Sequence, residues 1–404
     1  MTPVHRIGLN SGIAWTYLRT RRARESQLPL AEVSWMFAEK TVFVLGAGAN
    51  LEHGFVTGTV LKEKIRDSLR GEADGPWNVS GSDFFKELEY HTRSRHPVGF
   101  TTNELLRLST DITTGLGGTA SIDEFLHAHR TNERINRLGK FAIVNCILEL
   151  ESRSRICVDP ERLTRHALDL PEGAYSYLWE AMRRGMTVDG LSTLGDEKFW
   201  PVTIITFNYD RSLEQFLFCR LVAVYKQPAH VAARLVGAMK IIHVYGSVGP
   251  WICPHGAIGE PGGIPYGLKV SSQDKLNIFE PYMTEGVPLI CELANSISTY
   301  TQQIESGVAA TIKTAVQNAK QVYFLGVGYH AQNMKLLMPE DGLFANIIAG
   351  TAVGMTPFRC GEIERNLLQR TSVAVRNKGE VIKADRTCEE LFKDYGGVMQ
   401  GDSF

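Results

Sequence analysis

The sequence lacks the features that define several large protein classes. Its seven cysteines are scattered, odd in number and not arranged in pairs, which favours a reducing cytosol over a disulfide framework. No apolar run approaches the roughly 20 residues needed to cross a bilayer. The formal net charge of -1 gives no basic excess for a nucleic-acid surface. We therefore expect a cytoplasmic globular protein without a membrane segment and without direct nucleic-acid binding.

Metal-binding patterns are also scarce. The closest is Cys253-Pro-His255, a single Cys-x-His without a second pair of ligands. Structural zinc sites need four ligands, usually supplied as two such pairs. The sequence therefore predicts no bound metal.

The first 36 residues differ from the rest of the chain. Residues 20–24 are basic, and Gln27 to Pro29 interrupts any helix. A basic start that is not followed by an apolar stretch does not match a secretory signal. We expect residues 1–36 to form a mobile N-terminal arm, although a natural start at Met36 remains open.

The most informative segment is Lys40 to Asn50. Thr41 to Leu45 is a short apolar run rich in β-branched and aromatic residues, typical of a strand buried on both faces. It leads into Gly46-Ala-Gly48, and a helical pattern begins soon after at Thr57-Gly58. A strand, a glycine turn and a helix N-terminus together form an anion site, because backbone N–H groups and the helix dipole point at one spot. A Gly-x-Gly turn alone is a weak signal.

Beyond this segment the chain changes character twice. Residues 61 to about 200 are mostly helical, with a capping box at Ser121-Ile-Asp-Glu124. Strands then return at 202–207, 240–245, 321–325 and 346–349. The pattern predicts an α/β fold: a Rossmann-like parallel sheet with a large helical insertion, or cap, after the first strand-helix unit. We expect this domain to span 37–375, with the cap at 61–200 and a C-terminal tail at 376–404.

Small or polar residues follow four of these strands. Since the carboxyl ends of parallel strands meet at one edge, where ligands bind in open sheets, we expect these residues to lie together. The elements are Gly46-Ala-Gly48-Ala-Asn50, Thr206-Phe-Asn208-Tyr-Asp210, Tyr245-Gly246-Ser247 and Leu325-Gly326-Val-Gly328-Tyr329.

This set resembles the sirtuin-like superfamily, and within it the prokaryotic sirtuin-like domains of antiphage defence systems. The resemblance implies an NAD site without metal. By it Ala47, Gly48 and Thr206 would hold phosphates, Asn208 would orient the nicotinamide ribose and the attacking water, and Asp210 would meet the carboxamide. The residues implied to bind the cofactor are Gly46, Ala47, Gly48, Asn50, Thr206, Gly246, Ser247, Gly326 and Gly328. Each element also has a plainer interpretation, with Asn208 and Asp210 as helix caps and the glycines as ordinary turns.

The sequence departs from the family where the family has a histidine before Gly-Ser, because Tyr245 stands there. Residues two apart on a strand share a face, about 6.6 Å from each other, so His243 is a possible replacement base. Tyr245 is a poor base but a good hydrogen-bond partner for a ribose hydroxyl. A buried His243 satisfied by backbone is an equal alternative, and His255 is a weaker candidate base. The implied catalytic set is Asn208, Asp210, His243 and Tyr245.

The resemblance implies an NAD glycohydrolase that forms nicotinamide and ADP-ribose, open or cyclised, and acts as an antiphage abortive-infection effector. Such an enzyme needs control, for which we expect a homo-oligomer or a separately encoded regulatory partner. The alternative is a non-catalytic sensor module that binds NAD or ADP-ribose. A protein deacylase is disfavoured, because the two Cys-x-x-Cys pairs of sirtuin deacylases are missing.

Overall fold

A computed structural model describes residues 40–73, 79–92, 98–157, 170–183, 202–252, 264–268, 286–298 and 306–399. All of them belong to one compact unit, Trp35–Phe404, which is distinct from the unit Met1–Ser34. The expected arm at residues 1–36 and the Cys253-Pro-His255 motif lie outside the described residues.

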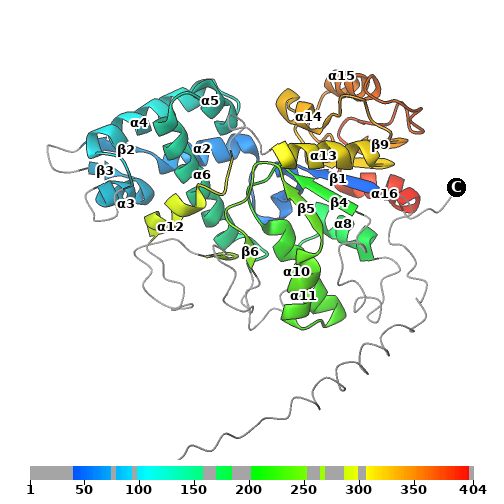
Figure 1. Ribbon diagram of the computed structural model, residues 1–404, viewed down its shortest axis with the longest axis horizontal. Coiled ribbons are helices and arrows are strands. Elements are labelled where there is room, and N and C mark those ends of the chain that lie inside the picture. The colour runs from blue at the N-terminus through cyan, green and yellow to red at the C-terminus, as the bar shows by residue number, and fades with distance from the viewer. Residues whose placement is uncertain are drawn as a thin grey trace, which may run out of the picture. The chain divides into compact units, whose positions relative to one another are not determined.

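A five-stranded parallel sheet forms the centre of the larger unit (Figure 1). Its order is β5-β4-β1-β8-β9, and every neighbouring pair is parallel, which confirms the predicted Rossmann-like parallel sheet. The strands are β1 (Thr41–Leu45), β4 (Val202–Thr206), β5 (Lys240–His243), β8 (Gln321–Leu325) and β9 (Ile347–Gly350). All five residues of β1 and of β8 are buried, as their continuous apolar character requires.

Helices cover both faces of this sheet. Helix α8 (Ala174–Arg183) packs against both α10 (Ser212–Tyr225) and α16 (Cys388–Met399). A stack of aromatic rings joins α16 to the sheet, because Phe43 of β1 lies against both Tyr323 of β8 and Phe392 of α16. The helices α13 (Ser306–Asn318) and α14 (Ala331–Leu337) pack against each other on the other face of the sheet. This is expected because β8 and β9 extend the sheet on the opposite side of β1 from β4 and β5, and right-handed crossovers then place their helices on the opposite face. Residues 376–399, expected as a tail, thus include a helix packed on the sheet.

The insertion between β1 and β4 is mainly helical, as predicted. It contains α2 (Gly58–Ser68), α3 (Asp83–Thr92), α4 (Thr102–Gly115), α5 (Ile122–Ala128) and α6 (Glu133–Arg153), and α8 also precedes β4. The sequence did not predict the short antiparallel pair β2 (Gly71–Ala73) and β3 (Val79–Gly81). At the start of α5, Ser121 accepts a hydrogen bond from the backbone N–H of Glu124, as its capping box predicts.

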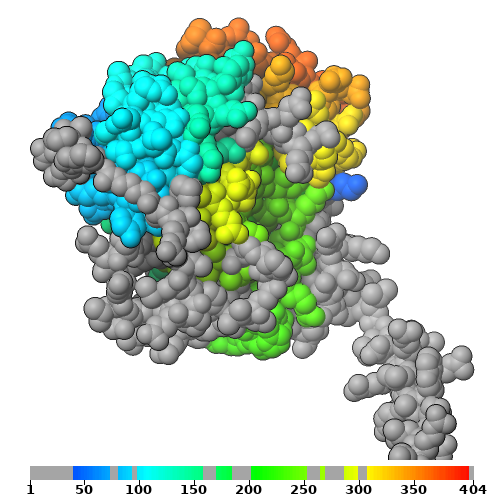
Figure 2. All heavy atoms as spheres, turned by 60° about the vertical axis from the view of Figure 1, so that its left-hand side comes forward, coloured from blue at the N-terminus to red at the C-terminus, as the bar shows by residue number. Residues whose placement is uncertain are grey.

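The remaining elements complete the unit. They are the 3-10 turns η1 (Ala47–Ala49), η2 (Leu51–His53) and η3 (Leu116–Gly118), the helices α11 (Ala229–Gly237), α12 (Gly286–Leu293) and α15 (Pro357–Leu368), and the short parallel pair β6 (Trp251–Ile252) and β7 (Ile264–Pro265). Helix α12 packs against α3 and α6, although it follows them by more than a hundred residues in the chain (Figures 1 and 2). Among the described residues, none of the helices is long and apolar enough to span a membrane.

Candidate functional site

The chain leaves β1 in one direction, toward β4 and β5, and later returns to its other side as β8 and β9. Such a topological switch point is where open α/β sheets bind ligands, outside the carboxyl ends of the strands. The switch point lies between β1 and β8. The two predicted glycine turns, which follow these two strands, therefore meet there.

The two turns cross each other at close range. Gly48 N–H donates to the Gly326 carbonyl at 3.0 Å, and Gly46 N–H donates to the Leu325 carbonyl at 3.0 Å. A Cβ on Gly46 would lie 2.5 Å from Gly326 O, and one on Gly48 would lie 2.8 Å from Gly326 Cα. Gly326 itself has a φ of 62°, a conformation that favours glycine. Backbone packing is therefore sufficient to require all three glycines.

The outer side of this crossing stays accessible. Ala47, Gly48 and Gly326 are partly exposed, and Gly328 is exposed. Gly326 N–H is held by Thr351 Oγ1 at 2.8 Å. The turn thus exposes backbone on its outer face, while its inner face packs against the turn that follows β8.

Asn208 joins the end of β4 to this crossing. Its side chain is buried, and Nδ2 donates to the Gly46 carbonyl at 3.3 Å. Its backbone N–H donates to Thr206 Oγ1 at 3.1 Å, so the Thr206 hydroxyl serves the turn internally. The structure therefore brings Asn208 and Gly46 together, although some 160 residues separate them.

Asp210 is the centre of a buried polar network. Its Oδ2 accepts from Asn50 Nδ2 at 2.9 Å, and its Oδ1 accepts from the Ser212 backbone N–H at 3.1 Å and from the Ser212 hydroxyl. Tyr175 of α8 shares a 3.0 Å hydrogen bond with that hydroxyl. Burial raises the pKa of Asp210 to about 6. The bond from Ser212 spans two residues, as in an Asx turn, and the N-cap of α10 is Arg211, so Asp210 does not itself cap this helix. Asn50 contacts Asp210 inside the protein.

His243 has both ring nitrogens engaged. Nδ1 lies 3.0 Å from the Asn208 carbonyl, and Nε2 lies 2.8 Å from Glu214 Oε1 of α10. Burial alone would lower the pKa of His243, but the Glu214 charge outweighs it and raises that pKa. The arrangement matches the alternative in which the histidine is satisfied by its surroundings.

Tyr245 faces a different direction from His243. The strand β5 ends at His243, and a turn follows in which Gly246 N–H donates to the His243 carbonyl at 3.2 Å. The expectation that His243 and Tyr245 share a strand face is therefore wrong, because a turn replaces the extended backbone. The Tyr245 hydroxyl donates to Asn333 Oδ1 of α14 at 2.6 Å.

The Gly246-Ser247 turn is held by residues that follow α12. Gly246 has a φ of 72° and pairs with Ile297. Ser247 Oγ donates to the Gly249 carbonyl at 2.8 Å, and its own carbonyl accepts from Ser296. Both residues are partly exposed, so the turn lines the same accessible edge as the crossing glycines.

Sequence reasoning missed several side chains that the structure adds to this edge. Asp123 of α5 accepts a 2.7 Å hydrogen bond from the Tyr209 hydroxyl. Asn333 comes from α14, and His330, which precedes that helix, is exposed and close enough for its charge to affect Asp123. An acidic residue in the first turn of α5 was visible in its capping box, but it indicated only a favourable helix dipole.

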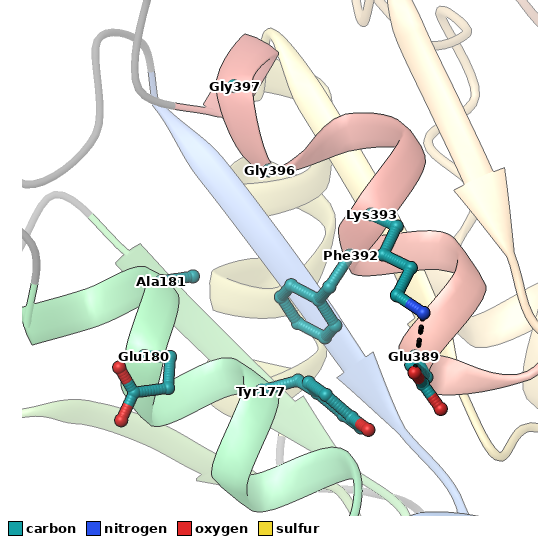
Figure 3. A pocket seen from close by; sticks show the side chains of 8 residues that line it. All are labelled: Tyr177, Glu180, Ala181, Glu389, Phe392, Lys393, Gly396 and Gly397. Carbon is teal, nitrogen blue, oxygen red and sulfur yellow. Dashed lines mark hydrogen bonds and ion pairs between the residues drawn. The ribbon is translucent and has the colours of Figure 1, made fainter.

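A cavity of about 280 Å³ lies elsewhere, between α8 and α16 (Figure 3). Tyr177, Phe392, Glu389 and Lys393 line it, and Lys393 pairs with Glu389 at 2.6 Å. None of the predicted site residues lines this cavity. The candidate site is accordingly the carboxyl edge of the sheet.

Comparison of the chain with protein-family models, with curated proteins and with solved structures finds no match. The functional argument therefore starts from the geometry of this edge.

Proposed function

We propose that the protein is an NAD glycohydrolase, which uses water to split NAD into nicotinamide and ADP-ribose. The observation that carries the proposal is the hydrogen bond from Asn208 Nδ2 to the Gly46 carbonyl. It holds a buried carboxamide against a phosphate-type glycine turn at the switch point of a parallel sheet. A turn of this kind suits the pyrophosphate of a dinucleotide, and the amide suits its ribose.

Hydrolysis of NAD needs few catalytic groups. Nicotinamide leaves NAD as a neutral molecule from a cationic ring, so no acid has to protonate it. The sugar passes through an oxocarbenium-like centre, which polar acceptors stabilise. Orienting one water near the anomeric carbon is then the main task. Asn208 is the residue we assign to it, with its amide already held by Gly46.

A second candidate is a module that binds NAD or ADP-ribose without cleaving it. The observation that favours it is the state of the two groups expected as a base. His243 is held by Glu214 and the Asn208 carbonyl, and the Tyr245 hydroxyl donates to Asn333. In this arrangement neither side chain accepts a proton from water without moving first.

Product analysis separates the two candidates. The purified protein is incubated with NAD, with and without an extract of phage-infected cells, and nicotinamide and open or cyclic ADP-ribose are measured. Removing an electrostatic stabiliser costs about 10²–10³-fold in rate, so we expect a loss of this size in Asn208→Ala. The matched control is Asn318→Ala, at the exposed end of α13, which should match the wild type.

Two outcomes would decide against the glycohydrolase. Equal nicotinamide release by wild type and Asn208→Ala would remove Asn208 from the reaction. Absence of release under every condition, combined with calorimetric binding of NAD or ADP-ribose, would establish the binding module instead.

We also propose that activity is controlled by assembly into a homo-oligomer or by a separately encoded partner, as an antiphage effector requires. An NAD-consuming enzyme without such control would drain its own cell. Full turnover by the purified monomer, unchanged by the infected-cell extract, would contradict this proposal.

A further inference from the structure

Side chains of the segment Asn208–Arg211 alternate between two neighbours. Asn208 and Asp210 bond to the β1 turn, through Gly46 and Asn50. Tyr209 and Arg211 instead bond to the helical insertion, through Asp123 and Glu151. The segment is therefore held from both sides, and the insertion is one of its two supports.

The first contact with the insertion is the hydrogen bond from Tyr209 to Asp123. The Tyr209 hydroxyl lies 2.7 Å from Asp123 Oδ1, at the start of α5. Tyr209 is buried, and burial together with the Asp123 charge raises its pKa well above 10. Burial also raises the pKa of Asp123, while the bond from Tyr209 and the charge of His330 oppose that rise. The phenol therefore acts as the donor, and the carboxyl group as the acceptor.

The same contact extends across the edge of the sheet. The rings of Tyr209 and Tyr245 lie 6.2 Å apart, and the Tyr245 hydroxyl donates to Asn333. Side chains from α5, from the ends of β4 and β5, and from α14 thus form one continuous row. A displacement of α5 would act on Tyr209 and, through it, on its neighbour Asn208.

A second contact with the insertion is made by Arg211, two residues after Tyr209. Arg211 and Glu151 of α6 are both fully buried and paired at 2.5 Å, and the Arg211 backbone N–H also donates to Glu151 at 2.9 Å. A buried ion pair rarely stabilises a protein more than apolar packing would, but it admits few alternative geometries. This pair anchors the far end of the segment, which leaves the Tyr209–Asp123 bond to orient its near end.

We propose that Asp123 is a positioning residue of the candidate site, which sets the orientation of Asn208 by holding Tyr209. Where it concerns catalysis, this inference rests on the proposed function. It makes helix α5 part of the site, because the orientation of Asn208 then depends on a hydrogen bond between the insertion and the end of β4.

The first test compares Asp123→Ala, Asp123→Asn and Tyr209→Phe in NAD cleavage. A side-chain hydrogen bond of ordinary strength corresponds to roughly a tenfold change, so Ala and Phe should each lower kcat about tenfold with little change in KM. Asp123→Asn keeps an acceptor for Tyr209 and should stay within about twofold of wild type. The double variant Asp123→Ala/Tyr209→Phe should be no slower than either single variant, because both remove one bond.

Two results would overturn the positioning role. If Asp123→Asn loses as much activity as Asp123→Ala, the charge of the carboxylate is what counts. If the losses of Asp123→Ala and Tyr209→Phe add in the double variant, the two residues act separately.

A second measurement does not depend on catalysis. Amide hydrogen exchange of a peptide that covers residues 207–212 should be faster in Asp123→Ala and Tyr209→Phe, and unchanged in Asp123→Asn. The control is Asp111→Ala, which removes an exposed ion pair with Arg107 on α4. A wild type that releases no nicotinamide would refute the proposed function alone, whereas unchanged exchange in Asp123→Ala would refute the positioning role.

Discussion

The two sides of the Asn208–Arg211 segment are stabilised in different ways. On the side away from β1, Arg211 uses its guanidinium fully, with bonds to Glu151 of the insertion and to the carbonyls of Pro250, Ile264 and Pro265, which follow β5 in the chain. On the β1 side, Asn50 Oδ1 and both ring nitrogens of His53 are buried without a hydrogen-bond partner among the described residues. A guanidinium whose N–H groups are all bonded indicates a structural support. Buried polar groups without a hydrogen-bond partner are instead typical of strained or functional sites.

The largest effect should come from breaking the saturated side. In Glu151→Gln the Arg211 charge stays buried without its counter-charge, which typically costs about 3–5 kcal/mol. We therefore expect the free energy of unfolding, measured in urea, to fall by about that amount. The matched control is Glu149→Gln, which removes an exposed pair with Arg153 and should cost less than about 1 kcal/mol. Equal losses in the two variants would mean that the buried Arg211–Glu151 pair supports the segment no more than an exposed pair on the same helix does.

The β1 side should respond to acid through His53. This histidine is fully buried between the rings of Tyr175 and Phe216. Burial, with a smaller contribution from the charge of Arg220, lowers its pKa to about 4. In the unfolded chain His53 becomes protonated near pH 6.5, whereas in the folded protein it stays neutral down to about pH 4. Protonation therefore favours the unfolded chain, and the free energy of unfolding falls as the pH falls from 6.5 toward 4.

The size of this loss can be measured by substitution. Between pH 7 and pH 5 the His53 contribution corresponds to about 2 kcal/mol, at 1.36 kcal/mol for each unit of pKa difference. In His53→Leu this part of the pH dependence should disappear, while any effect of packing remains the same at both pH values. If wild type and His53→Leu lose stability in parallel between pH 7 and pH 5, His53 is not held in its neutral form.

The smallest effect on stability should come from the His243–Glu214 pair, and its pH dependence should be opposite to that of His53. Because Glu214 raises the pKa of His243, this pair stabilises the fold below pH 6.5, and its contribution is lost as the pH rises through the folded-state pKa. The two side chains are 13% exposed, and Gln keeps a hydrogen-bond partner for the imidazole, so we expect Glu214→Gln to cost about 1 kcal/mol at pH 6. The difference from wild type should shrink toward pH 9, and a difference that stays constant from pH 6 to pH 9 would show that Glu214 does not raise the pKa of His243.

Local sequence patterns were sufficient to predict the sheet. The first strand, Thr41–Leu45, and the strand Gln321–Leu325 have the predicted bounds, because each is a short apolar run ended by glycine. The strand Lys240–His243 is shorter than predicted, because the turn at Gly246 begins two residues earlier than the apolar pattern suggests.

The side-chain partners were not predictable in the same way. Nothing in the sequence near Tyr209 points to Asp123, and nothing near Arg211 points to Glu151, because these pairs depend on how the insertion folds back on the sheet. The Gly46-Ala-Gly48 turn was predicted as part of an anion site, yet the close crossing of Gly48 and Gly326 already requires glycine at both positions. A local pattern indicates which residue types are needed at a position, but the identity of the neighbour comes only from the tertiary structure.

The position of β1 has a consequence for how this chain is made. Thr41 pairs with Val202 on one side and with Gln321 on the other, so β1 leaves the ribosome long before either neighbour has been synthesised. Pairings this distant in sequence form slowly, whereas the helices α2 to α6 can pack from local contacts. We expect the insertion to form first on the nascent chain, and the apolar strand β1 to wait for its neighbours, where a chaperone that covers short apolar segments would find its binding site.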